Sequence, residues 1–195
     1  MSTGRIIAAG LVGGIAVFFW GAFIHEGTPL GEMGIKSMPP ALEESVVPQF
    51  KKELTAENSF YFIPGMPDDK SDKAREAWTK KIEAGPTGLL LFHPGAGQAM
   101  SPKQLVVEFI TNVIAALILA VLLARWRTTI GGGAIIGLAI GFFGWVSIEA
   151  SYWNWYGYPS NYELAALIEQ CGGGFIGGLV VALVLGKPKA VTMPK

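Results

Sequence analysis

The stretch LVVEFITNVIAALILAVLLA, residues 105–124, carries a single charged side chain, that of Glu108, in a long run of mostly apolar residues. A helix needs about 20 predominantly apolar residues to cross a hydrocarbon core ~30 Å thick, so this stretch predicts a transmembrane helix. Three further runs of the same kind are Ile6–Ile24, Gly132–Ile148 and Leu164–Leu185. The run at Gly132–Ile148 is the shortest and could extend from Ile130 to Ala150. We therefore expect four transmembrane helices.

The composition agrees with four membrane spans. Hydrophobic residues make up 51% of the 195-residue chain, charged residues make up 15%, and the mean hydropathy is +0.42. Such values are ordinary for a small integral membrane protein and unusual for a soluble domain. The first run is longer than the apolar core of about 7–15 residues in a cleaved signal peptide, and no A-x-A-like site follows it. We therefore expect this run to remain as an anchor.

Six cations outside residues 25–104 predict the orientation of the spans. They are Arg5, Arg125, Arg127, Lys187, Lys189 and Lys195. They stand before the first span, between the second and third, and after the fourth, so alternating spans bring them to one side. Positively charged flanks tend to stay in the cytoplasm. We expect both termini in the cytoplasm of a bacterium, with the chain in its inner membrane and residues 25–104 outside. Zero net charge and the lack of a basic patch argue against nucleic acid as a partner.

The more polar residues 25–104 predict a small α+β insert between the first two spans. Its expected elements are a helix from Pro39-Pro40 to Leu54, a strand at Ser59–Gly65, a charged helix at Asp69–Ala84 and a strand at Gly88–Gly95. Pro48 lies inside the first of these helices and could kink it or divide it in two. With the charged helix between them, the two strands could pair in parallel as one right-handed βαβ unit.

The predicted fold is an all-α integral membrane protein, a bundle of four transmembrane helices with a small α+β extracytoplasmic insert. The domains are residues 1–24 with the first helix, 25–104 with the insert, 105–185 with the other helices and an outer aromatic loop at 151–160, and a cytoplasmic tail at 186–195. Two spans begin with helix-capping signals, Ser101 with Gln104 and Ser160 with Glu163. The sole cysteine, Cys171, cannot form an intramolecular disulfide, and we expect it to be a small packing residue.

Glycines recur at helical spacing in three of the spans. Those that we expect to contact other integral membrane subunits are Gly133, Gly137, Gly141, Gly173 and Gly177. Small residues four positions apart let two helix backbones approach closely. Glycine is also frequent in membrane helices in general, so a purely compositional origin of the pattern stays open. Membrane lipids are the other expected partner.

An aromatic segment, Tyr152-Trp-Asn-Trp-Tyr-Gly-Tyr158, separates the third and fourth runs. Amphipathic aromatic rings favour the depth of the lipid headgroups, so an interfacial belt is the simpler interpretation. The functional alternative is contact with a lipid, quinone or pigment. The candidate cofactor-binding residues in that case are Trp153, Trp155 and Tyr156.

Five glutamates gather at the depth of the outer leaflet in the predicted topology. They are Glu26, Glu108, Glu149, Glu163 and Glu169. Carboxylates are costly in hydrocarbon, so these side chains should face protein or water. A network of hydrogen bonds between helices, with Asn112 and Gln170 as members, is the simpler expectation. The alternative is a metal or haem site that uses His25, His93 and Glu26.

His25 has an explanation that needs no metal. It lies at the end of the first span, where a histidine can bond exposed carbonyl groups and interact with the negative end of the helix dipole. Gly27 then predicts a left-handed residue that stops the helix. We expect this structural role for His25, and no metal site.

The sequence contains no P-loop, no G-x-S-x-G elbow and no HExxH motif. We therefore expect no enzymatic activity and no required cofactor. The leading hypothesis is a non-catalytic structural or accessory subunit of a larger bacterial membrane complex, such as an electron-transport or photosynthetic complex. The alternative is a small membrane redox protein, or a metal- or haem-binding protein, with its site at the outer face.

Overall fold

The structure is a computed structural model that describes residues 1–55, 57–126 and 128–186. The chain forms two compact units. The bundle unit combines Met1–Ile35 with the chain from Met100 onward, and the insert unit is Lys36–Ala99. Arg127 and residues 187–195, which hold four of the six cations that predict the orientation, lie outside the described residues.

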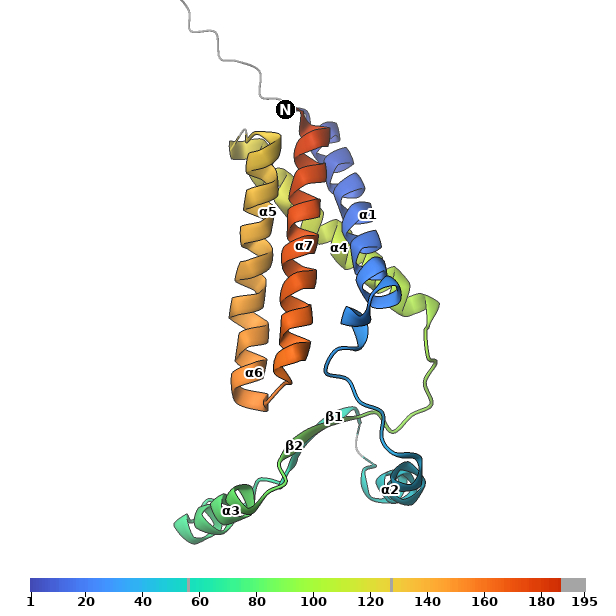
Figure 1. The fold of residues 1–195 in the computed structure, drawn as a ribbon, viewed down its shortest axis with the longest axis vertical. Coiled ribbons are helices and arrows are strands. Elements are labelled where there is room, and N and C mark those ends of the chain that lie inside the picture. The colour runs from blue at the N-terminus through green and yellow to red at the C-terminus, as the bar shows by residue number, and fades with distance from the viewer. Residues whose placement is uncertain (56, 127, 187–195) are drawn as a thin grey trace, which may run out of the picture. The chain divides into compact units, whose positions relative to one another are not determined.

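Four long helices make up the bundle unit (Figure 1). The first, second and fourth are α1 (Thr3–Gly27), α4 (Pro102–Trp126) and α7 (Ser160–Leu185). The third is continuous through three elements, namely α5 (Ile130–Gly144), the π-helical η2 (Trp145–Glu149) and α6 (Ala150–Tyr156). Each is long and apolar enough to cross a membrane, which confirms the four predicted helices. The predicted aromatic loop is wrong in its first part, because Ala150–Tyr156 continues the third helix up to the left-handed Gly157.

The bundle is held together by small and medium apolar residues. Helix α7 packs between α5 and α1, and α4 packs mainly on α1. The buried cluster consists of Ala9, Ala116, Leu119, Ala120, Leu123, Val181, Ala182 and Leu185. These residues come from α1, α4 and α7, and none of them carries a polar side chain. Close packing and dispersion therefore hold this part of the bundle, as expected where the surrounding solvent is itself apolar.

Glycines bring α5 and α7 into backbone contact. A Cβ atom added to Gly137 would overlap the carbonyl oxygen of Gly174, and one added to Gly174 would overlap the carbonyl oxygen of Gly137. Gly133 and Gly178 face each other in the same reciprocal way. A Cβ atom at Gly141 would overlap the Gln170 carbonyl oxygen. Helices this close lose van der Waals contact if either gains a methyl group.

The opposite side of α7 meets α1 through Gly173 and Gly177. Val17 of α1 lies 3.7 Å and 3.0 Å from Cβ atoms built on these two glycines. All five glycines expected to contact other subunits thus contact helices of their own chain. Contact of these glycines with other subunits stays a prediction.

One of the two predicted capping signals is confirmed and the other is wrong. Ser101 Oγ accepts a hydrogen bond from the Gln104 amide at 3.2 Å, and the Gln104 side chain accepts one from the Ser101 amide at 2.9 Å. Helix α7 instead begins at Ser160, after Pro159, without a side-chain cap. The Ser160 hydroxyl is engaged elsewhere, because it accepts a hydrogen bond from Trp153 Nε1 at 3.1 Å.

Helix α1 ends without the left-handed stop that was predicted at Gly27, so this prediction is wrong. Gly27 is the last residue of the helix, and Thr28 has an extended backbone. The Thr28 hydroxyl donates to the Ile24 carbonyl at 2.7 Å and accepts from the Leu30 amide at 3.1 Å. A threonine side chain can satisfy these backbone groups without a left-handed residue. The short 3₁₀ helix η1 (Pro29–Glu32) follows and packs on α1 and α7.

The insert unit contains two helices and a two-stranded sheet. The elements are α2 (Pro40–Glu53), β1 (Ser59–Ile63), α3 (Asp72–Ala84) and β2 (Gly88–Phe92). Helix α2 is continuous through Pro48, so of the two alternatives for this residue the division of the helix is excluded. Phe50 of α2 packs edge-on against Phe92 of β2, with 5.8 Å between the ring centroids.

The strands pair antiparallel, from Ser59 opposite Phe92 to Ile63 opposite Gly88, so the predicted parallel βαβ unit is wrong. A parallel crossover must carry the chain from the end of β1 back to its start. Trp78, in the middle of α3, instead donates a hydrogen bond from Nε1 to the carbonyl of Pro64 at 3.2 Å. Helix α3 is thereby held at the end of β1, and the chain re-enters the sheet from that same end.

Candidate functional site

Polar side chains gather at one end of the bundle, where α1 ends, α4 begins, α6 ends and α7 begins; this end is termed the insert end. His25 Nε2 of α1 lies 3.2 Å from Glu169 Oε1 of α7. Trp20 Nε1, also from α1, donates to the backbone carbonyl of Glu169 at 3.0 Å. The Trp20 ring lies so close to α7 that a Cβ atom at Gly172 would overlap it. Together these contacts tie α1 to α7.

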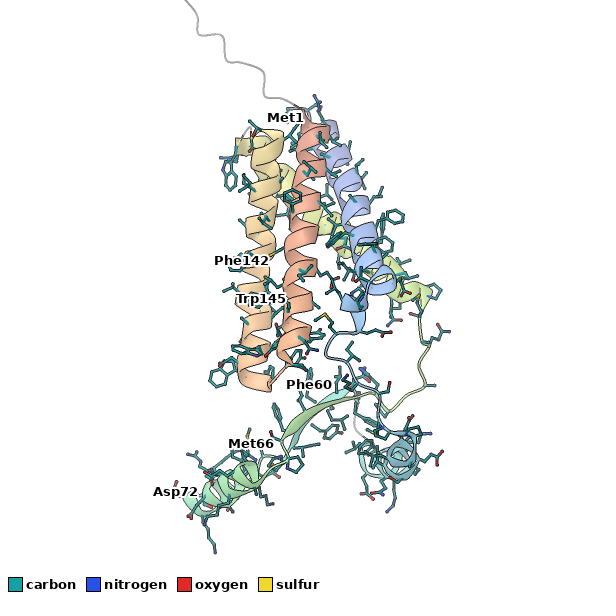
Figure 2. All side chains as sticks on the ribbon, viewed as in Figure 1. Met1, Phe60, Met66, Asp72, Phe142 and Trp145 are labelled. Carbon is teal, nitrogen blue, oxygen red and sulfur yellow. The ribbon has the colours of Figure 1, made fainter. Side chains whose placement is uncertain are left out.

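A second polar contact ties the third helix to α7. Gln170 Nε2 donates to Glu149 Oε1 at 3.0 Å, and Trp145 Nε1 donates to the Glu163 carbonyl at 3.0 Å. Trp145 also stacks on Phe142, with ring centroids 6.2 Å apart (Figure 2). Helix α1 and the third helix thus each contribute one tryptophan that bonds a carbonyl of α7.

The π-helical turn explains how Glu149 reaches α7. The residues of the third helix that meet α7 are four apart: Gly133, Gly137, Gly141, Trp145 and Glu149. In a regular α-helix each step of four advances by roughly 40° around the axis, so a long series would leave the contact face. The wider turn at Trp145–Glu149 takes more residues per turn and reduces this drift. It keeps a tryptophan and a carboxylate on the face that meets α7.

Glu163 is the most unusual residue of this region. Its side chain is enclosed, with 4% of the residue exposed. Neither carboxylate oxygen has a hydrogen-bond partner among the described residues. Burial of a carboxylate without donors is expensive, and such a group is either neutral or bound to something else. The sequence places Glu163 near the start of α7, but the expectation of a capping role for it is wrong.

Tyrosines form a chain of ring contacts beside Glu163. Tyr152 lies 5.7 Å from Tyr156 and 5.5 Å from Tyr158, and Tyr158 lies 5.5 Å from Tyr162, measured between ring centroids. Burial raises the pKa of the Tyr158 phenol above its ordinary value, and the negative charges of its neighbours raise it further. Tyr158 therefore stays protonated at neutral pH.

The three candidate cofactor-binding aromatics are exposed on and around α6. The exposed fractions are 52% for Trp153, 77% for Trp155 and 44% for Tyr156. The indole nitrogen of Trp153 donates a hydrogen bond to Ser160 Oγ at 3.1 Å. Exposed aromatic rings at the end of an apolar helix fit the headgroup region of a bilayer. Contact with a lipid, quinone or pigment stays a prediction.

The residues of the metal alternative do not form a described cluster. His25 contacts Glu169, Glu26 is exposed in the last turn of α1, and His93 belongs to the insert unit. Within residues 1–55, 57–126 and 128–186, no group of three or more His, Cys, Asp or Glu side chains has the geometry to hold a metal ion.

Glu108 and Asn112 form a pair of their own on α4. Asn112 Nδ2 donates to Glu108 Oε1 at 2.9 Å. Both continue the stripe of α4 that further along carries the buried Ala116 and Leu119, but Glu108 itself is exposed. The expected network between helices therefore takes the form of separate pairs. Glu169 and Glu149 each contact a side chain of a neighbouring helix, whereas Glu108 contacts Asn112 of its own helix.

Sequence reasoning missed the tryptophans and Thr28. Trp20 and Trp145 were available as signals, because an indole N–H buried in apolar surroundings needs an acceptor. Their spacing from the glutamates gives no hint that the acceptors are backbone carbonyls of α7. The role of Thr28 was not predicted because the adjacent Gly27 is the stronger signal for the end of a helix.

Comparison of the chain with protein-family models, curated proteins and solved structures finds no match.

Proposed function

We propose that the chain is a non-catalytic, multi-pass subunit of a larger bacterial membrane complex, such as an electron-transport or photosynthetic complex. In this proposal it lies in the inner membrane with both termini in the cytoplasm and the insert outside. The observation that carries the proposal is the state of the insert unit, which has no buried residue among its described positions. A chain segment of this size normally needs a core of its own or a surface that covers it.

One face of the insert sheet is the surface best suited to be covered. Phe60 and Leu91 are cross-strand partners and are 62% and 55% exposed. The other face carries Phe92, on which Phe50 of α2 packs. A two-stranded sheet with only one face packed is marginal in water. Exposed apolar side chains on neighbouring strands are typical of a site where another protein binds.

The exposed Glu108 on α4 supports a second contact inside the membrane. It lies six residues after the first residue of α4, which is about 9 Å along the helix. Intramembrane carboxylates usually face protein or water. A helix of another subunit that presents a hydrogen-bond donor would satisfy both Glu108 and the apolar stripe beside it.

Site-specific photocrosslinking tests the proposal. A photoreactive amino acid is placed at position 60 or 91 of the tagged full-length chain, and membranes are irradiated before solubilisation. The matched control carries it at position 83, on the exposed polar side of α3. We expect positions 60 and 91 to give one discrete adduct with a second polypeptide, identified by mass spectrometry, and position 83 to give none. A chain that purifies in mild detergent as a monomer, with no protein adduct from either strand, would show that the proposal is wrong.

The metal- or haem-binding alternative makes a different prediction about the same preparation. It requires an absorption spectrum or a stoichiometric metal content that disappears in both His25→Ala and His93→Ala. The subunit proposal expects neither the spectrum nor a metal signal that depends on these two residues.

A further inference from the structure

Glu163 is enclosed in a place where little can stabilise a negative charge. Both oxygens of its carboxyl group are inaccessible and lack hydrogen-bond donors among the described residues. No ion pair of the described residues includes it. The Trp145 indole, which lies close by, bonds the backbone carbonyl of Glu163 and leaves the side chain unpaired.

The titratable groups around Glu163 are mostly acidic. Glu149 of η2 acts on it through its charge, and the phenols of Tyr158 and Tyr162 lie close enough to be affected by a charge on Glu163. Further along α7, Glu169 is engaged by His25 of α1. Helix α6 contributes Tyr152 and Tyr156, and η1, which also packs on α7, contributes Glu32. A second negative charge beside Glu149 would therefore be opposed both by burial and by repulsion.

Glu149 and Glu163 differ in the hydrogen-bond donors that their carboxyl groups have. Glu149 accepts a hydrogen bond from Gln170 at 3.0 Å, and a donor of this kind stabilises negative charge on a carboxyl group. Glu163 has no such donor. When two neighbouring carboxyl groups share one proton, the proton resides mainly on the group whose carboxylate form is less stabilised by hydrogen bonds.

We propose that Glu163 is a proton-binding site, which holds a carboxylic acid proton at neutral pH beside an ionised Glu149. On release, the O–H bond of Glu163 breaks, its electron pair stays on the oxygen, and the proton passes to a water molecule, which becomes hydronium. Glu163 can thus store one proton at the insert end of the bundle. The proposal does not depend on whether the chain is a subunit of a complex.

Infrared spectroscopy of the purified full-length chain tests this proposal, because a protonated carboxyl group has a C=O stretching band that a carboxylate lacks. We expect the wild-type chain to show this band at neutral pH and to lose it in a single step as the pH rises. Glu163→Gln should remove the band. Glu149→Gln should retain it but move its loss to lower pH, because the repelling charge is gone.

Glu108→Gln is the matched control, since Glu108 is an exposed carboxylate in a helix of the same bundle and accepts a bond from Asn112. It should leave the band unchanged. Circular dichroism and gel filtration establish that each variant keeps its fold. The proposal is wrong if the wild-type chain has no protonated band at neutral pH. It is also wrong if the band persists in a folded Glu163→Gln variant.

Discussion

His25 shows how a residue can be placed well by sequence and yet have a different partner from the expected one. The prediction put it at the end of a membrane helix, where a histidine needs no metal, and α1 does end two residues later. Its described contact is the side chain of Glu169 on α7 rather than a carbonyl of its own helix. Glu169 lies 144 positions away in sequence, and no local pattern relates the two residues.

We predict that the His25–Glu169 pair contributes little to stability. The two side chains are 56% and 34% exposed, and ion pairs with this much solvent contact are worth at most about 1 kcal/mol. A double-mutant cycle with His25→Ala and Glu169→Gln, measured by unfolding the chain in mixed detergent micelles, should give a coupling energy of that size. A coupling of several kcal/mol would contradict a simple surface contact and would favour a bound ion shared by the two residues.

Among the helices, the α5–α7 contact depends most clearly on particular residue types. Reciprocal contacts between Gly137 and Gly174 place a carbonyl oxygen of each helix where a side chain of the other would begin. The spacing of glycines predicted close helix packing, but it did not reveal the partner helix. That choice depends on which faces of α7 meet α5 and α1, and both faces carry glycine.

We predict that Gly174→Ala destabilises the bundle by about 1–3 kcal/mol, as overpacking does where the backbone must move. Gly131→Ala is a matched control, because it lies in α5 and has open space where the new methyl group would stand. Its effect should fall within about 0.5 kcal/mol, as for other surface substitutions. Unfolding in mixed micelles measures both changes. Equal effects of the two substitutions would show that α5 and α7 do not meet at Gly174.

For the molecule as a whole, we predict that all four helices cross the membrane. An even number of spans then returns the chain to its starting side, so both ends of the bundle unit would lie on that side. Arg5 in the first turn of α1 and Arg125 in the last turn of α4 predict that this side is the cytoplasm. The insert, which connects α1 to α4, must then lie outside.

Cysteine labelling in a Cys171→Ser background tests this topology. We predict that a membrane-impermeant maleimide labels Glu83→Cys in intact spheroplasts and labels Ser2→Cys only after the membrane is opened. Both positions are exposed, so that access to the reagent depends on the side of the membrane. Labelling of Ser2→Cys alone in intact spheroplasts would reverse the orientation.

The amino-acid sequence was sufficient for the features that depend on local composition. Four apolar runs were long enough to predict four helices, and the capping residues Ser101 and Gln104 marked the start of α4. Apolar length and capping are properties of neighbouring residues, so they can be recognised without knowing the partners of a segment. The same holds for the depth of the glutamates along their helices.

The features that depend on partners distant in sequence emerged only from the folded chain. The antiparallel pairing of β1 and β2 follows from the anchoring of α3 by Trp78. Glu149 lies in a π-helical turn and is bonded by Gln170, whereas Glu163 is enclosed without a donor among the described residues. Burial and hydrogen bonding are set by the faces that helices turn toward each other. A segment of sequence specifies a helix, but the packing of several helices decides which carboxyl groups of that helix can carry a charge.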